Sequence, residues 1–136
     1  MLWRGDCCRV VLAADPYYPA FCRVILNRHV KEMTDLDENE RSRLMTVVFV
    51  VEAALRELLR PDKINLASLG NITPHVHWHV IPRFAADRHF PNPVWGAAKH
   101  DAAALPLAAA QLQSLRERLA EKLKRQPETI FERGQP

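Results

Sequence analysis

Three of the six histidines in this chain occupy alternate positions, as His75, His77 and His79. Successive side chains of an extended strand point to opposite faces, so we expect these imidazoles to share one face, roughly 7 Å apart from one to the next. The intervening Val76 and Trp78 would share the other face, which is apolar enough to be buried. A row of imidazoles on a rigid strand can supply a nucleophile with its helpers, or ligands to a metal ion.

The residues leave three interpretations of this row open. A purely structural role is the least favoured, because an imidazole row inside a core would need several hydrogen-bond partners. The second interpretation is a zinc site, since neutral imidazole is a common zinc ligand. However, the first and third imidazoles lie roughly 13 Å apart by strand rise, and neither the carboxylates nor the other histidines stand at a recognisable ligand spacing; those histidines are His29, His89 and His100.

The third interpretation is nucleophilic attack on phosphorus. Imidazole has an ordinary pKa of about 6.5, so it is largely neutral and already nucleophilic at pH 7. If one ring nitrogen donates to a carbonyl, the other presents its lone pair to the phosphorus atom. We expect His77 to attack, because it alone has a helper on each side, and those helpers can donate to phosphoryl oxygens or protonate a leaving group.

Short strands and turns surround this row. Segments 8–13 and 21–27 are rich in β-branched and other apolar residues, which predicts two strands. A third strand is expected over 63–69. The short turn at Gly70-Asn71 then makes the third strand and the histidine strand antiparallel neighbours, and Pro82 closes the histidine strand.

Two helices complete the pattern. Asp37 is placed as the N-cap of a long helix and Glu40 as the return half of a capping box, while Pro61 ends it. A C-terminal helix is expected from about Pro106 to about Arg125. Each has one apolar stripe, formed by Leu44, Val47, Val48, Val51, Leu55 and Leu58 in the first and by Leu112, Leu115, Leu119 and Leu123 in the second. The expected fold class is α+β, an antiparallel sheet of about five strands with a long central helix and a C-terminal helix against one face.

The whole chain fits one domain with one core. With 136 residues, 48% of them hydrophobic and 26% charged, it reads as soluble and globular. We expect a single domain over 1–136. Its parts are a core at about 2–83, an irregular loop at 84–104, the C-terminal helix at 105–125 and a loose tail at 127–136.

The net charge and the cysteine content limit which binding partners and which cellular compartment we expect for this protein. The net charge of +3 suits an anionic substrate without indicating nucleic acid. The longest apolar run, 47–51, is far shorter than a membrane span, so no membrane association is expected. The three cysteines are odd in number and two are adjacent, which favours reduced thiols in the cytoplasm.

The segment from His75 to Ile81 resembles the signature of the histidine-triad (HIT) family, His-φ-His-φ-His-φ-φ with φ apolar, at all of its positions. The continuation Pro82-Arg83 is frequent in that family. The order strand, strand, long helix, strand, turn, histidine strand is also similar to the family's architecture across about residues 2–83.

The resemblance implies a nucleotide hydrolase or transferase that cleaves a P–O or P–N bond at the α-phosphate, in a dinucleoside polyphosphate or a nucleoside phosphoramidate. His77 would form a covalent nucleotidyl-histidine, His79 would contact the phosphate and the leaving group, and His75 would orient His77 through its backbone carbonyl. The implied substrate is a purine nucleotide with an AMP-type product. The resemblance further implies no catalytic metal or other cofactor, and a homodimer whose two sheets join.

Five further residues are candidates for substrate binding. Asn65 and Asn71 could supply amide contacts, although Gly70-Asn71 can equally be simple turn chemistry. Asp15 lies closest to where the family often carries an acid for the ribose hydroxyls. Thr73 is one position from the family's usual hydroxyl residue, and Arg83 could hold a phosphate electrostatically, although an arginine at a strand end is usually solvated.

The chain also departs from the family pattern. Phe21 stands where many members carry a helper histidine, and Ala13-Ala14 replaces the usual acid at the end of the first strand. Trp95 lies in a proline-rich loop, where it could cover the site or anchor the loop. Two alternatives therefore stay open: a nucleotide- or protein-binding module with a vestigial triad, and a zinc-binding protein.

Overall fold

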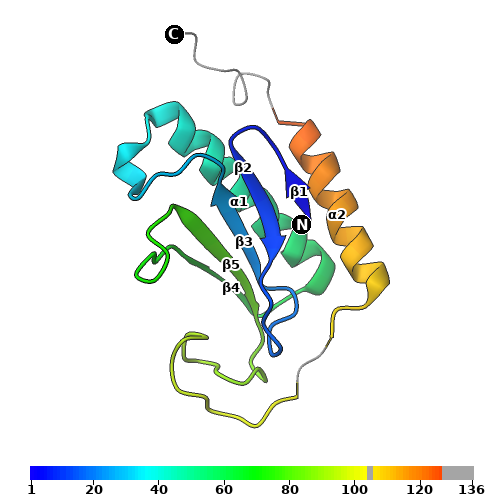
Figure 1. Ribbon diagram of the computed structural model, residues 1–136. Helices are drawn as coiled ribbons and strands as arrows, with labels where there is room; N and C mark the ends of the chain where they lie inside the picture. The colour runs from blue at the N-terminus through cyan, green and yellow to red at the C-terminus, as the bar shows by residue number, and fades with distance from the viewer. Residues whose placement is uncertain (104–105, 127–136) are drawn as a thin grey trace.

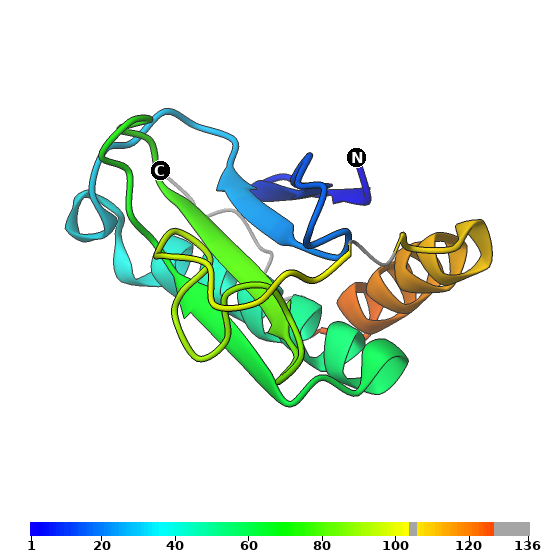
Figure 2. The same ribbon diagram turned by 90° about the horizontal axis from the view of Figure 1, so that it is seen from below.

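The structure, a computed structural model, describes residues 1–103 and 106–126. Five antiparallel strands form one sheet in the order β1-β2-β3-β5-β4, and two α-helices lie on one side of it (Figures 1 and 2). The strands are β1 Trp3–Arg4, β2 Cys8–Leu12, β3 Cys22–Leu26, β4 Lys63–Ala67 and β5 His77–Arg83; the helices are α1 Glu38–Leu59 and α2 Ala109–Lys124, with a short 3-10 helix at Met33–Asp35. The expected α+β class is confirmed.

The register of the sheet places β5 between β3 and β4. His79 pairs with Arg23 of β3 on one side and with Ala67 of β4 on the other. His77 pairs with Ile25 of β3. The expected antiparallel pairing of β4 with β5 is confirmed, and both histidines of β5 therefore lie in the interior of the sheet rather than at an edge.

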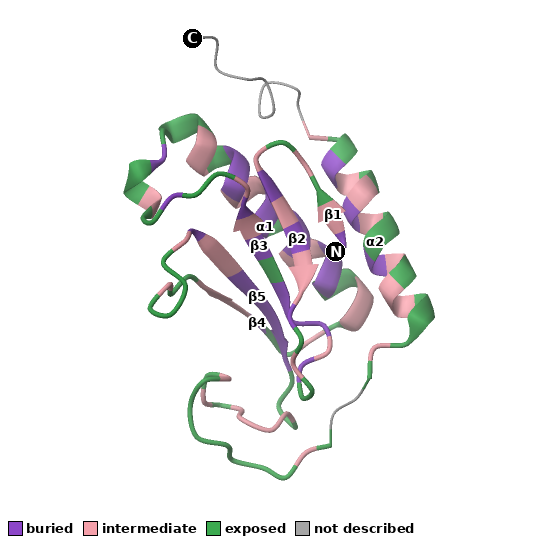
Figure 3. Ribbon diagram, in the orientation of Figure 1, coloured by how far each residue is buried: buried purple, intermediate pink, exposed green. Residues whose placement is uncertain are grey.

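Helix α1 begins as its sequence predicts. The Asp37 side chain accepts a hydrogen bond from the Glu40 backbone nitrogen, and the Glu40 side chain accepts one from the Asp37 nitrogen, which completes the capping box. The helix ends at Leu59, and its C-cap residue Arg60 adopts the left-handed conformation just before Pro61. Its apolar stripe packs on β3 and β5, and Figure 3 shows buried residues following the facing surfaces of sheet and helix.

Helix α2 packs against α1 through Leu115, Leu119 and Leu123, all of them buried. It begins at Ala109, slightly later than the sequence predicts from Pro106. The loop that precedes it contains no helix or strand through residue 103. The expected tail at 127–136 lies outside the described residues. No helix within the described part of the chain is long and apolar enough to cross a membrane.

The histidine strand differs from its prediction at both ends. It begins at His77, because the His75 nitrogen bonds back to the Thr73 oxygen in a turn. It also continues through Pro82, which was expected to close it. The pairing of β5 with β3 ends at Val80, so β5 has a neighbour on one side only at Pro82, and a proline without an N–H is tolerated there.

Candidate active site

A cleft of about 590 Å³ opens on the face of the sheet that the helices leave uncovered. The triad His75, His77 and His79 lines it. The described residues that share the cleft come from β2, β3, the turn before β5 and the loop after it, and are Arg9, Arg23, Ile25, Leu69, Gly70, Asn71, Ile72, Thr73 and Trp95. None of these residues is acidic, so the cleft suits an anion.

The ring of His77 is held by the backbone of His75. Its Nδ1 lies 2.6 Å from the His75 carbonyl oxygen. A carbonyl can only accept, so Nδ1 carries the proton and donates it in this hydrogen bond. In the neutral ring the lone pair is therefore on Nε2, the nitrogen a nucleophile needs to present.

His75 is itself fixed by a second chain of hydrogen bonds. Its Nε2 donates to the Leu26 carbonyl oxygen at 2.7 Å. Its Nδ1 then accepts from Nδ1 of His29, 3.1 Å away, and the two rings stack with centroids 5.2 Å apart and planes 10° from parallel. Sequence reasoning considered His29 only as a metal ligand. It follows β3, the strand paired with β5, and that placement is the signal that could have found it.

His79 is buried, with 4% of its surface exposed, and aromatic rings contact its imidazole. Edge-on contacts come from Phe21, with ring centroids 5.3 Å apart, and from Trp95, at 4.9 Å. Burial, together with the nearby His77 and Arg23, lowers the pKa of His79 from 6.5 to about 4. This imidazole is therefore neutral at pH 7, and its Nδ1 has no hydrogen-bond partner among the described residues.

Two predicted substrate contacts lie in the cleft with the triad. Asn71 and Thr73 are both exposed in the turn before β5. Gly70 has a φ of 85°, a conformation that side chains with a Cβ rarely adopt, and so it sets the path of this turn. Asn71 and Thr73 therefore belong to the wall of the cleft that also contains His77.

Three other predicted contacts, Asn65, Arg83 and Asp15, are not among the residues that line the cleft. Arg83 is 2% exposed, and its Nε and Nη1 donate to Asp87 and to the Asn65 side-chain oxygen, each at 2.8 Å. This places Asn65 and Arg83 in a buried network that anchors the following loop. Asp15 instead accepts hydrogen bonds from the backbone nitrogens of Tyr17 and Tyr18, which is turn capping.

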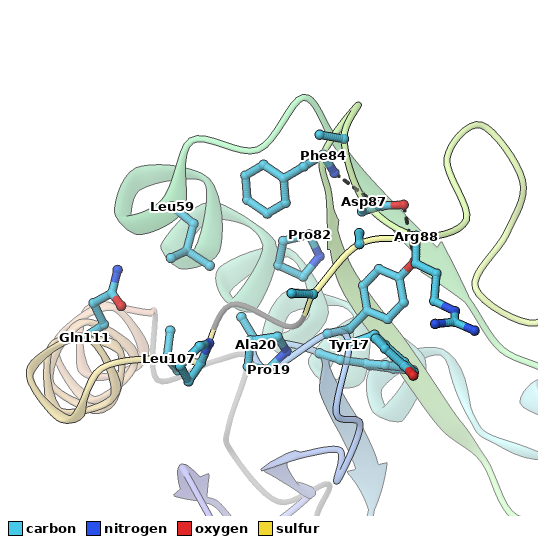
Figure 4. A pocket seen from close by; sticks show the side chains of 16 residues that line it. Tyr17, Pro19, Ala20, Leu59, Pro82, Phe84, Asp87, Arg88, Leu107 and Gln111 are labelled. Carbon is cyan, nitrogen blue, oxygen red and sulfur yellow. Dashed lines mark hydrogen bonds between the residues drawn. The ribbon is translucent and has the colours of Figure 1, made fainter. Parts of the chain in front are cut away.

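A second cavity of about 260 Å³ lies near the start of α2, beyond the end of β5 (Figure 4). Leu59, Pro82, Phe84 and Leu107 are among its apolar walls, and Asp87 lies at its edge. None of the predicted site residues lines it. The triad cleft is therefore the site of interest. Within the described residues, no group of three or more His, Cys, Asp or Glu side chains is arranged to hold a metal ion.

An antiparallel α+β sheet carrying a histidine row at its centre defines a histidine-triad protein. The family described as the HIT domain matches residues 1–86. The chain therefore belongs to the HIT family. The structure of a histidine triad protein from Bradyrhizobium japonicum is similar, with a TM-score of 0.72, 33% identity, and coverage of 89% of this chain and 87% of that one.

Two curated relatives are similar over part of their length. One is an AP-4-A phosphorylase of Mycobacterium tuberculosis, 29% identical over 69% of this chain and 51% of that protein. The other is a bis(5'-nucleosyl)-tetraphosphatase (asymmetrical) of Schizosaccharomyces pombe, 32% identical over 53% of this chain and 42% of that protein. The chain thus spans about half the length of these relatives or less.

Proposed function

We propose that this protein is a nucleotide hydrolase or transferase that cleaves a P–O or P–N bond at the α-phosphate through a nucleotidyl-histidine intermediate. The observation that carries the proposal is the hydrogen bond from His77 Nδ1 to the His75 carbonyl at 2.6 Å. It leaves the Nε2 lone pair for attack, in a cleft that combines histidines and arginines with no carboxylate among its described lining.

In the proposed reaction, His77 Nε2 attacks the α-phosphorus, a P–N bond forms, and the bond from phosphorus to the leaving group breaks. A polyphosphate leaves as its anion, whereas the nitrogen of a phosphoramidate takes up a proton from solvent and leaves as the amine. The positive charge that develops on His77 is stabilised by its hydrogen bond to the carbonyl of His75. Water then attacks the same phosphorus and releases a proton to solvent, the P–N bond breaks, His77 returns to its starting form, and a nucleoside monophosphate leaves. A neutral His79 serves this sequence by donating a hydrogen bond to phosphoryl oxygen, and Asn71 and Thr73 bind the remaining oxygens.

The substrate we propose is a dinucleoside polyphosphate or a nucleoside phosphoramidate with a purine base. The names of the two curated relatives support the first of these classes. The proposal includes a homodimer that works in the cytoplasm without a cofactor, and the free thiols of Cys7, Cys8 and Cys22 accord with that compartment.

The test is product analysis. We expect AMP from diadenosine tetraphosphate or from adenosine 5'-phosphoramidate, and quenching the reaction with alkaline denaturant, which preserves the acid-labile P–N bond, should reveal adenylylated protein. His77→Ala should abolish both signals, whereas His100→Ala, a change to an exposed loop histidine outside the cleft, should retain them.

The outcomes separate the alternatives. AMP formation that survives in His77→Ala would overturn the proposed nucleophile. Tight AMP binding without turnover in the unchanged protein would favour the binding module. Stoichiometric zinc in the purified protein, lost on changing His75 or His79, would favour the metal interpretation.

A further inference from the structure

Two arginines stand beside the triad, and sequence reasoning did not assign them a role. Arg9 of β2 and Arg23 of β3 both line the cleft that holds His77 and His79. Arg23 is the direct cross-strand partner of His79. Arg9 pairs with Ile25, which in turn pairs with His77. At a strand spacing of about 4.8 Å, Arg23 is one strand and Arg9 two strands away from the histidine row.

Neither guanidinium is neutralised by an acidic side chain of the residues that the structure describes. Among residues 1–103 and 106–126, no ion pair involves Arg9 or Arg23. Arg23 is exposed and lies over the Phe21 ring, with its Cζ 5.7 Å from the ring centroid. Two positive charges on one face and at adjacent strands, with no carboxylate of the described residues paired to either, repel each other unless an anion bridges them.

Arg9 is also held in place by neutral groups. Its Nη1 donates to the Asn27 side-chain oxygen at 3.3 Å. The Asn27 amide nitrogen donates in turn to the carbonyl oxygens of Gly5 and Asp6, at 2.8 and 3.1 Å. This arrangement orients the guanidinium and leaves its charge intact, as a site for an anionic ligand requires.

We propose that Arg9 and Arg23 form a subsite for a second anionic group of the substrate, beyond the α-phosphate that His77 attacks. The inference rests on the proposed function for the identity of the first group. The second group is a phosphate, which can come from the leaving group's polyphosphate chain or from the sugar of the nucleoside. Phosphate oxygens and guanidinium groups form charge-assisted, bidentate hydrogen bonds, so the subsite selects substrates with two or more phosphates.

Binding measurements test the subsite without requiring turnover. In a His77→Asn background, calorimetry compares AMP, which has one phosphate, with ADP and with adenosine 3',5'-bisphosphate. We expect one of the two-phosphate ligands to bind at least about tenfold more tightly than AMP, the scale of one charge-assisted hydrogen bond. ADP as the tighter ligand identifies the leaving-group chain, and the 3',5'-bisphosphate identifies the sugar.

The preference should disappear in Arg9→Gln and in Arg23→Gln. It should be partly kept in Arg9→Lys, which retains the charge but not the planar fork. Arg116→Gln is the matched control, since it removes an exposed arginine from α2, outside the cleft. Circular dichroism establishes that each variant is folded.

Equal affinity for the three ligands, or a preference that survives in both glutamine variants, would overturn the subsite. AMP production without such a preference refutes the subsite alone. A preference that depends on the arginines, in a protein that turns over no substrate, supports the subsite while the proposed hydrolysis fails. The two proposals are therefore separable.

Discussion

Replacing Asp87 by asparagine should destabilise the protein far more than an ordinary surface change, because its carboxylate neutralises a buried guanidinium. Arg83 is 2% and Asp87 8% exposed at the side chain, and Nε and Oδ2 are 2.8 Å apart. The carboxylate also accepts hydrogen bonds from the backbone nitrogens of Phe84, His89 and Phe90 and from the Tyr18 hydroxyl. Asparagine keeps the shape but loses the charge and one acceptor.

Two energies set the range for the free energy of unfolding that Asp87→Asn should lose. Burial would raise the pKa of Asp87, but the hydrogen bonds from Arg83 and from the backbone outweigh it and lower the pKa from 3.8 to about 2. At 1.36 kcal/mol for each pKa unit, that shift corresponds to about 2 kcal/mol. Removing one partner of a buried pair typically costs about 3–5 kcal/mol, because the other charge stays buried. We therefore expect Asp87→Asn to lower the free energy of unfolding by about 2–5 kcal/mol.

Urea denaturation at pH 7 measures this loss. Glu57→Gln is the control, since Glu57 also pairs with two cations, Arg118 and Lys122, but at the surface, where such pairs contribute little. The native stability should also decrease as the pH falls from about 3.8 to about 2, because the unfolded carboxylate takes up a proton first, and Asp87→Asn should lack this component. If Asp87→Asn shifts the urea midpoint no further than Glu57→Gln does, the buried network is not what holds the loop.

Two further predictions concern the triad cleft. The depressed pKa of His79 means that the unfolded imidazole binds a proton more readily than the folded one, so stability should decrease as the pH falls from about 6.5 to about 4, by at most about 3 kcal/mol. Urea titrations across this range should show the decrease in the unchanged protein and a weaker one in His79→Phe; a flat profile in the unchanged protein would contradict the assignment. Gly70→Ala should lower the free energy of unfolding by roughly 1–2 kcal/mol, because a φ of 85° strains a residue with a Cβ. Gly70→Asn should lower it by less, since asparagine tolerates this conformation better than alanine does. Equal stability of all three proteins in thermal melts would exclude strain at this turn.

At position 21, where the chain departs from its family pattern, an aromatic side chain contacts His79. Many members carry a helper histidine there, whereas here Phe21 packs edge-on against His79 and also lies beneath Arg23. Trp95 packs edge-on against the same imidazole and also against Phe21, with the Phe21 and Trp95 centroids 6.2 Å apart. Two aromatic rings thus contact His79, and one of them, Phe21, also carries the Arg23 guanidinium over its face.

The sequence by itself determined the elements that local patterns encode. The capping box of Asp37 and Glu40 and the apolar stripe predicted α1, because caps and helical periodicity are properties of neighbouring residues. The alternation of His77 and His79 placed both on one face, because a strand repeats every two residues. The family signature then indicated the chemistry that such a row can perform.

Only the tertiary structure decided which distant residues meet that row. His75 precedes the strand and stacks on His29, and Arg83 pairs with Asp87 in a buried position. Arg9 and Arg23 join the cleft through the register of three strands. These outcomes depend on pairing between segments far apart in the chain and on which charges become buried together. The spacing of neighbouring residues determines neither the pairing nor the burial.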